Sequence, residues 1–185
     1  MSILIVDDAE DIRGLIKAIL EAGGYRDLIT ADSANEAFKK LGLPITESLG
    51  GFLRSEGKDE NVCSPSDIDL ILLDIILPDM DGIDVCRRIK SSKKCEEIPI
   101  VMVTAKKEAD KLESSFNSGA VDYIKKPLDR VELLARVRLA LKLKKSMDDY
   151  RQCREKLEDN NLALDNAQRK IESLQASLQN RQSLA

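Results

Sequence analysis

The segment DLILLDIILPDMDG, residues 69–82, contains the most apolar strand-like run of the 185-residue chain. Its first part, residues 69–73, is short and almost continuously apolar, as expected for a strand that is buried on both faces of a parallel sheet. Asp74 follows this run directly. The segment therefore predicts a buried strand that ends at a carboxylate.

Similar strand-like runs occur on both sides of this segment. They cover residues 2–6, 28–31, 98–104 and 121–124. Segments with helical periodicity separate or follow them, near residues 12–20, 34–41, 83–89 and 112–116 and from residue 129 onward. Ser33 is placed to cap the second of these helices. Five strands that alternate with five helices predict an α/β fold with a doubly wound parallel sheet covered on both faces.

The composition excludes several classes of site. Histidine is absent, which removes Ser-His-Asp and Cys-His catalysis, histidine-ligated metals and a phosphohistidine carrier. The four cysteines, at positions 63, 86, 95 and 153, are scattered and predict reduced thiols rather than disulfides or a zinc site. A net charge of −4 implies no basic surface for nucleic acid or an anionic membrane. No membrane-spanning run or secretory signal is present, so we expect a cytoplasmic protein.

Residues 43–67 interrupt the alternation of strands and helices. This stretch is rich in glycine, serine and charged residues and separates the second helix from the third strand. So long a connection is uncommon in a compact domain. It is either a tolerated surface insertion or a loop that binds a partner.

The C-terminal part of the chain has a seven-residue repeat and contains neither glycine nor proline from about residue 139. The a positions of the repeat are Tyr150, Leu157, Leu164, Ile171 and Leu178, and the d positions are Cys153, Asn160, Ala167, Leu174 and Arg181. We predict a domain over residues 1–140, followed over 141–185 by a helix continuous with the preceding one that forms a parallel homodimeric coiled coil. A solitary charged helix, or a helix docked on a missing domain, are the alternatives.

Acidic residues follow two of the predicted strands. Asp7 and Asp8 lie at the end of the first strand, and Asp74 lies at the end of the third. In a doubly wound sheet these strand ends lie side by side, where such folds bind ligands. Three carboxylates at one place need raised pKa values or a cation, and oxygen ligands suit Mg²⁺.

Two further polar residues belong to the same edge of the sheet. Thr104 ends the fourth strand and offers a hydroxyl, and Lys126 follows the fifth strand and offers a positive charge for a phosphoryl oxygen. A carboxylate nucleophile, Mg²⁺, a hydroxyl and an ammonium together suit transfer of a phosphoryl group to an aspartate. Each residue alone has an ordinary structural explanation, but their joint placement favours a site.

Four motifs resemble successive signatures of bacterial response-regulator receiver domains. They are ILIVDDAEDIR, LILLDIILPDMDGIDVCRRIK, IPIVMVTA and GAVDYIKKPLDRVELLARV. The resemblance covers about residues 2–140 apart from the insertion. It implies a flavodoxin-like (CheY-like) sheet with strand order 2-1-3-4-5. It also implies a phosphoprotein of a two-component phosphorelay.

The same resemblance implies roles for the acidic residues. Asp74 would be the phosphoacceptor, because it begins the D-x-x-x-P-x-M-D-G run. Asp8, Asp74 and the backbone carbonyl of Ile76 would bind Mg²⁺, and Asp7 would act through water. Ile76 offers no side chain to position a hydrolytic water.

The remaining roles concern the switch and its partners. Thr104 and Lys126 would contact the phosphoryl group, the bond from Lys126 to Pro127 would be cis, and Tyr123 would change position together with Thr104. The phosphoryl donor would be a histidine kinase or a histidine phosphotransfer protein. The change would pass through the fifth helix into the coiled coil and control a partner or a C-terminal effector domain missing from these residues.

Two other functions are compatible with parts of the pattern. An aspartyl phosphatase usually carries a second aspartate two residues after the nucleophile, where this chain has Ile76. A receiver-shaped dimerisation scaffold would not use phosphorylation and would not need the intact acidic site. We therefore expect a chain that catalyses only its own phosphorylation and dephosphorylation and is not otherwise an enzyme.

Overall fold

The computed structural model describes residues 1–44, 68–105 and 117–182. The insertion predicted over residues 43–67 therefore lies almost wholly outside the described residues, and so does the helix predicted near residues 112–116. The chain divides into two compact units, residues 1–144 and 145–185. The first contains the sheet and the second is helical.

Strands and helices alternate from β1 to β4, and β5 is followed by α5; the segment between β4 and β5 lies largely outside the described residues. Its elements are β1 (Ser2–Val6), α1 (Glu10–Ala22), β2 (Asp27–Ala31), α2 (Ala34–Lys40), β3 (Leu70–Asp74), α3 (Gly82–Ser91), β4 (Ile100–Ala105), β5 (Asp122–Lys126) and the beginning of α5 (Arg130–Gln182). The strands form one parallel sheet in the order β2-β1-β3-β4-β5. Both the fold class and the predicted strand order are confirmed.

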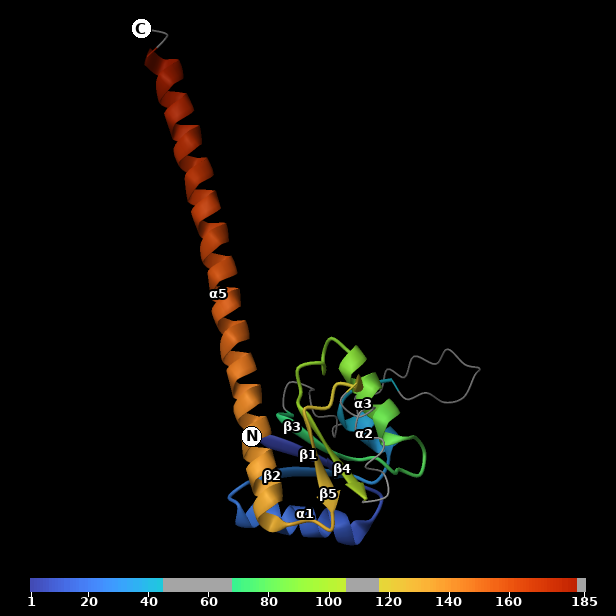
Figure 1. Ribbon diagram of the computed structural model, residues 1–185. Helices are drawn as coiled ribbons and strands as arrows, with labels where there is room; N and C mark the ends of the chain where they lie inside the picture. The colour runs from blue at the N-terminus through green and yellow to red at the C-terminus, as the bar shows by residue number, and fades with distance from the viewer. Residues whose placement is uncertain (45–67, 106–116, 183–185) are drawn as a thin grey trace, which may run out of the picture. The chain divides into compact units, whose positions relative to one another are not determined.

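Helices cover both faces of the sheet (Figure 1). One hydrophobic cluster joins the sheet to α2 and α3, with Phe38, Cys86 and Ile89 fully buried. The second cluster joins the opposite face to α1 and the first turns of α5, with Leu20 and Leu133 fully buried. Because β1 and β3 are enclosed on both sides, every one of their residues is buried. This burial explains their continuous apolar sequence.

Three strands extend further than their apolar runs. β3 includes Asp74, β4 includes Thr104 and Ala105, and β5 reaches Lys126. The predicted strands end at residues 73, 104 and 124, so they stop one residue short in β3 and β4 and two residues short in β5. In β3 and β5 the residues beyond the prediction are charged, and the apolar pattern therefore stops before the strand does. Parallel pairing continues through these residues, with Asp74 opposite Val103. The polar side chains are therefore held by the sheet itself rather than by mobile connections.

The second helix carries the predicted cap. The hydroxyl of Ser33 accepts a hydrogen bond from the backbone N–H of Glu36 at 3.3 Å. The carboxylate of Glu36 accepts one from the N–H of Asp32 at 2.8 Å, which ties the residue before the cap to the first turn of the helix. This short helix therefore begins at a well-defined residue.

The second unit consists of the later part of α5. Its side chains are exposed from residue 149 to residue 170, including the apolar residues at three a positions of the repeat, Tyr150, Leu157 and Leu164. Among the described residues, no helix is long and apolar enough to cross a membrane.

Candidate functional site

The carboxyl ends of β1 and β3 bring together the three predicted acidic residues. Carboxylate oxygens of Asp7, Asp8 and Asp74 all lie within 4.8 Å of one another. Asp7 and Asp74 are buried, whereas Asp8 is exposed. The cluster is therefore a partly open acidic site at the end of the sheet.

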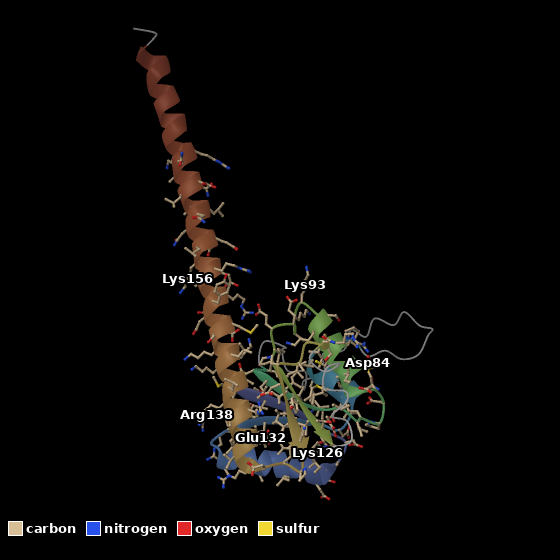
Figure 2. The ribbon with its side chains drawn as sticks, in the orientation of Figure 1. Asp84, Lys93, Lys126, Glu132, Arg138 and Lys156 are labelled. Carbon is tan, nitrogen blue, oxygen red and sulfur yellow. The ribbon has the colours of Figure 1, made fainter. Side chains whose placement is uncertain are left out.

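Lys126 connects the two buried carboxylates. Its Nζ lies 2.8 Å from Oδ2 of Asp7 and 2.6 Å from Oδ2 of Asp74. Lys126 comes from the end of β5, as Figure 2 shows, while Asp74 ends β3 and the other two acidic residues directly follow β1. The charged groups therefore come from the ends of three strands, and Lys126 balances part of the negative charge.

The local electrostatics differ from those of exposed groups. Burial raises the pKa of the Asp74 carboxyl above its ordinary value, Lys126 opposes this rise, and Asp7 adds to it. For Lys126, burial disfavours the ammonium, but the two carboxylates outweigh burial and raise its pKa. Lys126 is therefore charged at neutral pH.

The acidic residues fit a magnesium ion. Within the described part of the chain they offer three carboxylates against one ammonium, which leaves an excess of negative charge at an exposed edge. Their ligand atoms are all oxygen, which Mg²⁺ prefers and which leaves room for water ligands. With Asp8 exposed, an ion can reach the cluster from solvent.

Thr104 and Tyr123 lie on the neighbouring strands. Thr104 is buried and follows Val103, the residue that pairs with Asp74. Its hydroxyl donates a hydrogen bond to the carbonyl of Ala105 at 3.1 Å. Tyr123 is half-buried and packs against the cluster that contains α2 and α3.

The loop after β3 passes close to the acidic cluster. Ile76 is 55% exposed, and its N–H donates to Oδ1 of Asp74 at 3.4 Å. The loop closes where the N–H of Gly82 donates to the carbonyl of Ile75 at 2.7 Å. A Cβ on Gly82 would lie 2.0 Å from the backbone oxygen of Asp74, so only glycine fits there. The predicted cis bond between Lys126 and Pro127 is present.

Two residues near the cluster were not predicted from sequence. Arg13 on α1 donates from a guanidinium nitrogen to the backbone carbonyl of Asp7 at 2.6 Å. Asp79, in the loop after β3, accepts two hydrogen bonds from the first turn of α2. Neither contact has a sequence signature. The α2 partners of Asp79 lie more than 40 residues earlier in the chain, before the insertion.

Comparison with known proteins gives a consistent result. The family model described as the response regulator receiver domain matches residues 56–138. The transcriptional regulatory protein YvrH of Bacillus subtilis is 38% identical over 142 residues, which is 76% of this chain and 49% of that protein. The DNA-binding dual master transcriptional regulator RpaA of Synechocystis sp. is 33% identical over 140 residues, 76% of this chain and 48% of that protein.

The structural comparison points to the same group of proteins. A crystal structure of a putative response regulator from Chloroflexus aurantiacus superimposes with a TM-score of 0.60 and 27% identity. The superposition covers 76% of this chain and 96% of that one. In contrast, the chain spans about half the length of the two curated relatives, 49% and 48%.

Proposed function

Because the chain carries a receiver domain of the two-component response regulator family, we propose that it accepts a phosphoryl group on Asp74 from a partner phosphohistidine. The observation that supports this proposal best is the arrangement of Asp74 beside Asp7, Asp8 and Lys126 at the carboxyl end of the sheet. Apart from its own phosphorylation and dephosphorylation, the chain catalyses no reaction in this proposal.

The residues of the cluster divide the chemistry between them. A carboxylate oxygen of Asp74 attacks phosphorus, forming a P–O bond while the P–N bond to the donor histidine breaks. Lys126 then compensates charge on the phosphoryl oxygens. Asp8, Asp74 and the Ile76 carbonyl would hold Mg²⁺, which supplies charge neutralisation at the reacting group, and Asp7 would act through water.

The structural response to phosphorylation would begin at Thr104 and Tyr123, on the strands next to Asp74. Thr104 would turn its hydroxyl to the new phosphoryl group, and Tyr123 would repack on the same side. The change would reach α5, whose later residues would pair with a second copy as a parallel coiled coil. A histidine kinase or histidine phosphotransfer protein is the proposed donor. The charge of −4 favours a protein partner over nucleic acid for these 185 residues.

The proposal is tested by intact mass after incubation with Mg²⁺ and acetyl phosphate. We expect wild type to gain one phosphoryl group, and Asp74→Ala to gain none. Asp84→Asn is the matched control, since Asp84 is an exposed carboxylate on α3 paired with Arg87, and it should be phosphorylated like wild type. No gain by wild type with either acetyl phosphate or a phosphohistidine donor would instead support a phosphorylation-independent dimerisation scaffold.

A further inference from the structure

Asp79 makes a tertiary bridge beside the acidic cluster. It lies in the loop between β3 and α3, and its carboxylate faces the first turn of α2. The N–H of Ala34 donates to Oδ1 and the N–H of Asn35 donates to Oδ2, both at 2.9 Å. Asp79 lies 45 residues after Ala34 and 44 residues after Asn35, so these bonds hold together two segments that are far apart in sequence.

The two segments that Asp79 joins each make a backbone hydrogen bond to an aspartate of the acidic cluster or close to it in the chain. On the loop side, Ile76 precedes Asp79 by three residues, and its N–H donates to Asp74 at 3.4 Å. On the α2 side, the carbonyl of Ala31 at the end of β2 accepts a hydrogen bond from the N–H of Asp7 at 3.2 Å. The carboxylate of Asp79 therefore links the backbone next to Asp74 to the backbone next to Asp7.

Asp79 does more than cap α2, because the side chain of Ser33 already caps this helix. The hydroxyl of Ser33 accepts from the N–H of Glu36, and Glu36 accepts in turn from the N–H of Asp32. What Asp79 adds is a fixed distance between the loop after β3 and the first turn of α2. Groups that hold ligand-bearing backbone in place tune metal sites without touching the metal.

We propose that Asp79 is a positioning residue for phosphorylation of Asp74. It holds the loop that carries the Ile76 carbonyl against the turn that anchors Asp7, and it thereby sets the affinity of the acidic cluster for Mg²⁺. This inference rests on the proposed function, because the loop matters only where Asp74 and Mg²⁺ act together.

The test measures Mg²⁺ binding to the unphosphorylated protein by calorimetry. We expect Asp79→Ala to weaken binding by about tenfold, as loss of an outer-shell partner does at other metal sites. Asp79→Asn keeps one acceptor oxygen and should lose less. The phosphorylation rate of both variants should fall strongly at low Mg²⁺ and recover towards the wild-type rate at saturating Mg²⁺.

Ser33→Ala is the matched control, because it weakens the same end of α2 but leaves the bridge to the loop intact. It should bind Mg²⁺ as wild type does. Wild-type affinity in Asp79→Ala, or an equal loss in Ser33→Ala, would overturn the inference. If Asp79→Ala does not fold, Asp79→Asn decides in the same way. If wild type is not phosphorylated, the proposed function is rejected instead. If wild type is phosphorylated and the Asp79 variants bind Mg²⁺ as wild type does, only this inference is rejected.

Discussion

At the scale of single residues, one ammonium holds two buried carboxylates in place. The side chains of Asp7 and Asp74 are 1% and 6% exposed, and Lys126 between them is 21% exposed. Carboxylates removed from water in this way are costly unless a cation pairs with them. Lys126 therefore stabilises the fold of the resting domain as well as serving the proposed reaction.

Replacing Lys126 should reveal its contribution to the stability of the fold. Lys126→Met removes the ammonium that pairs with Asp7 and Asp74. We therefore expect the free energy of unfolding to fall by about 3 kcal/mol, the low end for a broken buried pair, since Lys126 is partly exposed. Urea denaturation without Mg²⁺ measures this loss. Lys125→Met, one residue earlier and exposed, is the control and should change stability by less than about 0.5 kcal/mol.

The cost of Lys126→Met should depend on pH in a defined direction. Because the pKa of Asp74 is raised in the fold, its protonated form is favoured there, and its ionisation at higher pH costs stability. Without Lys126 that pKa rises further. The stability difference between wild type and variant should therefore shrink as pH falls towards the pKa of Asp74, and a constant difference would contradict the assignment of this ion pair.

At the scale of elements, the start of α3 is pressed against the end of β3. A Cβ on Gly82, the first residue of α3, would lie 2.0 Å from the backbone oxygen of Asp74 and 2.7 Å from Cα of Ile75. Backbone atoms cannot move aside as a flexible side chain can. We therefore expect Gly82→Ala to reduce stability by about 1–3 kcal/mol, as overpacking does, and to slow phosphorylation of Asp74.

Gly14→Ala, in α1, provides the contrasting change from glycine to alanine at an open position. Gly14 lies on the exposed side of α1, where a Cβ would meet nothing within 4 Å. Alanine should stabilise α1 by about 0.5–1 kcal/mol, because glycine is a poor helix former. Thermal unfolding of both variants, together with their phosphorylation rates, measures the contrast. Equal effects would show that the close approach at Gly82 is not what restricts that position.

The order of the elements could be predicted from sequence because apolar periodicity reports burial directly. β1 was predicted with its observed bounds, since all five of its residues are buried and apolar. The ends of β3 and β5 were missed, since Asp74 and Lys126 are polar although they belong to the ladder. Periodicity identifies what a strand buries, but it does not reveal where backbone pairing stops.

The site could be predicted as a set of residues, but its supports could not. The acidic residues were expected together because parallel strands place their carboxyl ends at one edge. Arg13 and Asp79 contribute through bonds to backbone atoms, and any polar residue could have served as a surface group at either position. Contacts to backbone that are not part of a regular local motif, such as the cap at Ser33, leave no partner type to recognise in a sequence, so only the structure reveals them.

At the scale of the whole molecule, the second unit leaves an apolar stripe uncovered. Tyr150, Leu157 and Leu164 are 72%, 57% and 66% exposed. They recur every seven residues, and Cys153 and Asn160 occupy the d positions between them. A stripe with this spacing is buried efficiently by a second copy of the same helix. The half-polar d positions would weaken such a dimer.

This arrangement predicts a specific crosslink. In a parallel dimer in register, two d residues face each other within the Cα–Cα distance of about 4.4–6.8 Å that a disulfide requires. Cys153 is exposed, whereas Cys86 and Cys95 are buried. In a Cys63→Ser background, a mild oxidant should therefore yield a covalent dimer through Cys153 that Cys153→Ser cannot form, as non-reducing electrophoresis would show.

Substitutions on the helix surface test whether the stripe causes the pairing. Leu157→Lys places a charge at an a position and should abolish the crosslink, because burying an unpaired ammonium costs more than a weak dimer gains. Leu162 is as exposed as its neighbours but lies outside both the a and d rows, so Leu162→Lys should crosslink like the parent. An antiparallel pair would separate the two Cys153 side chains along the helix, since Cys153 lies near one end of the repeat. A dimer that is seen in sedimentation but never forms the Cys153 crosslink would therefore reject the parallel orientation. An equal loss of the crosslink in Leu157→Lys and Leu162→Lys would reject the heptad register.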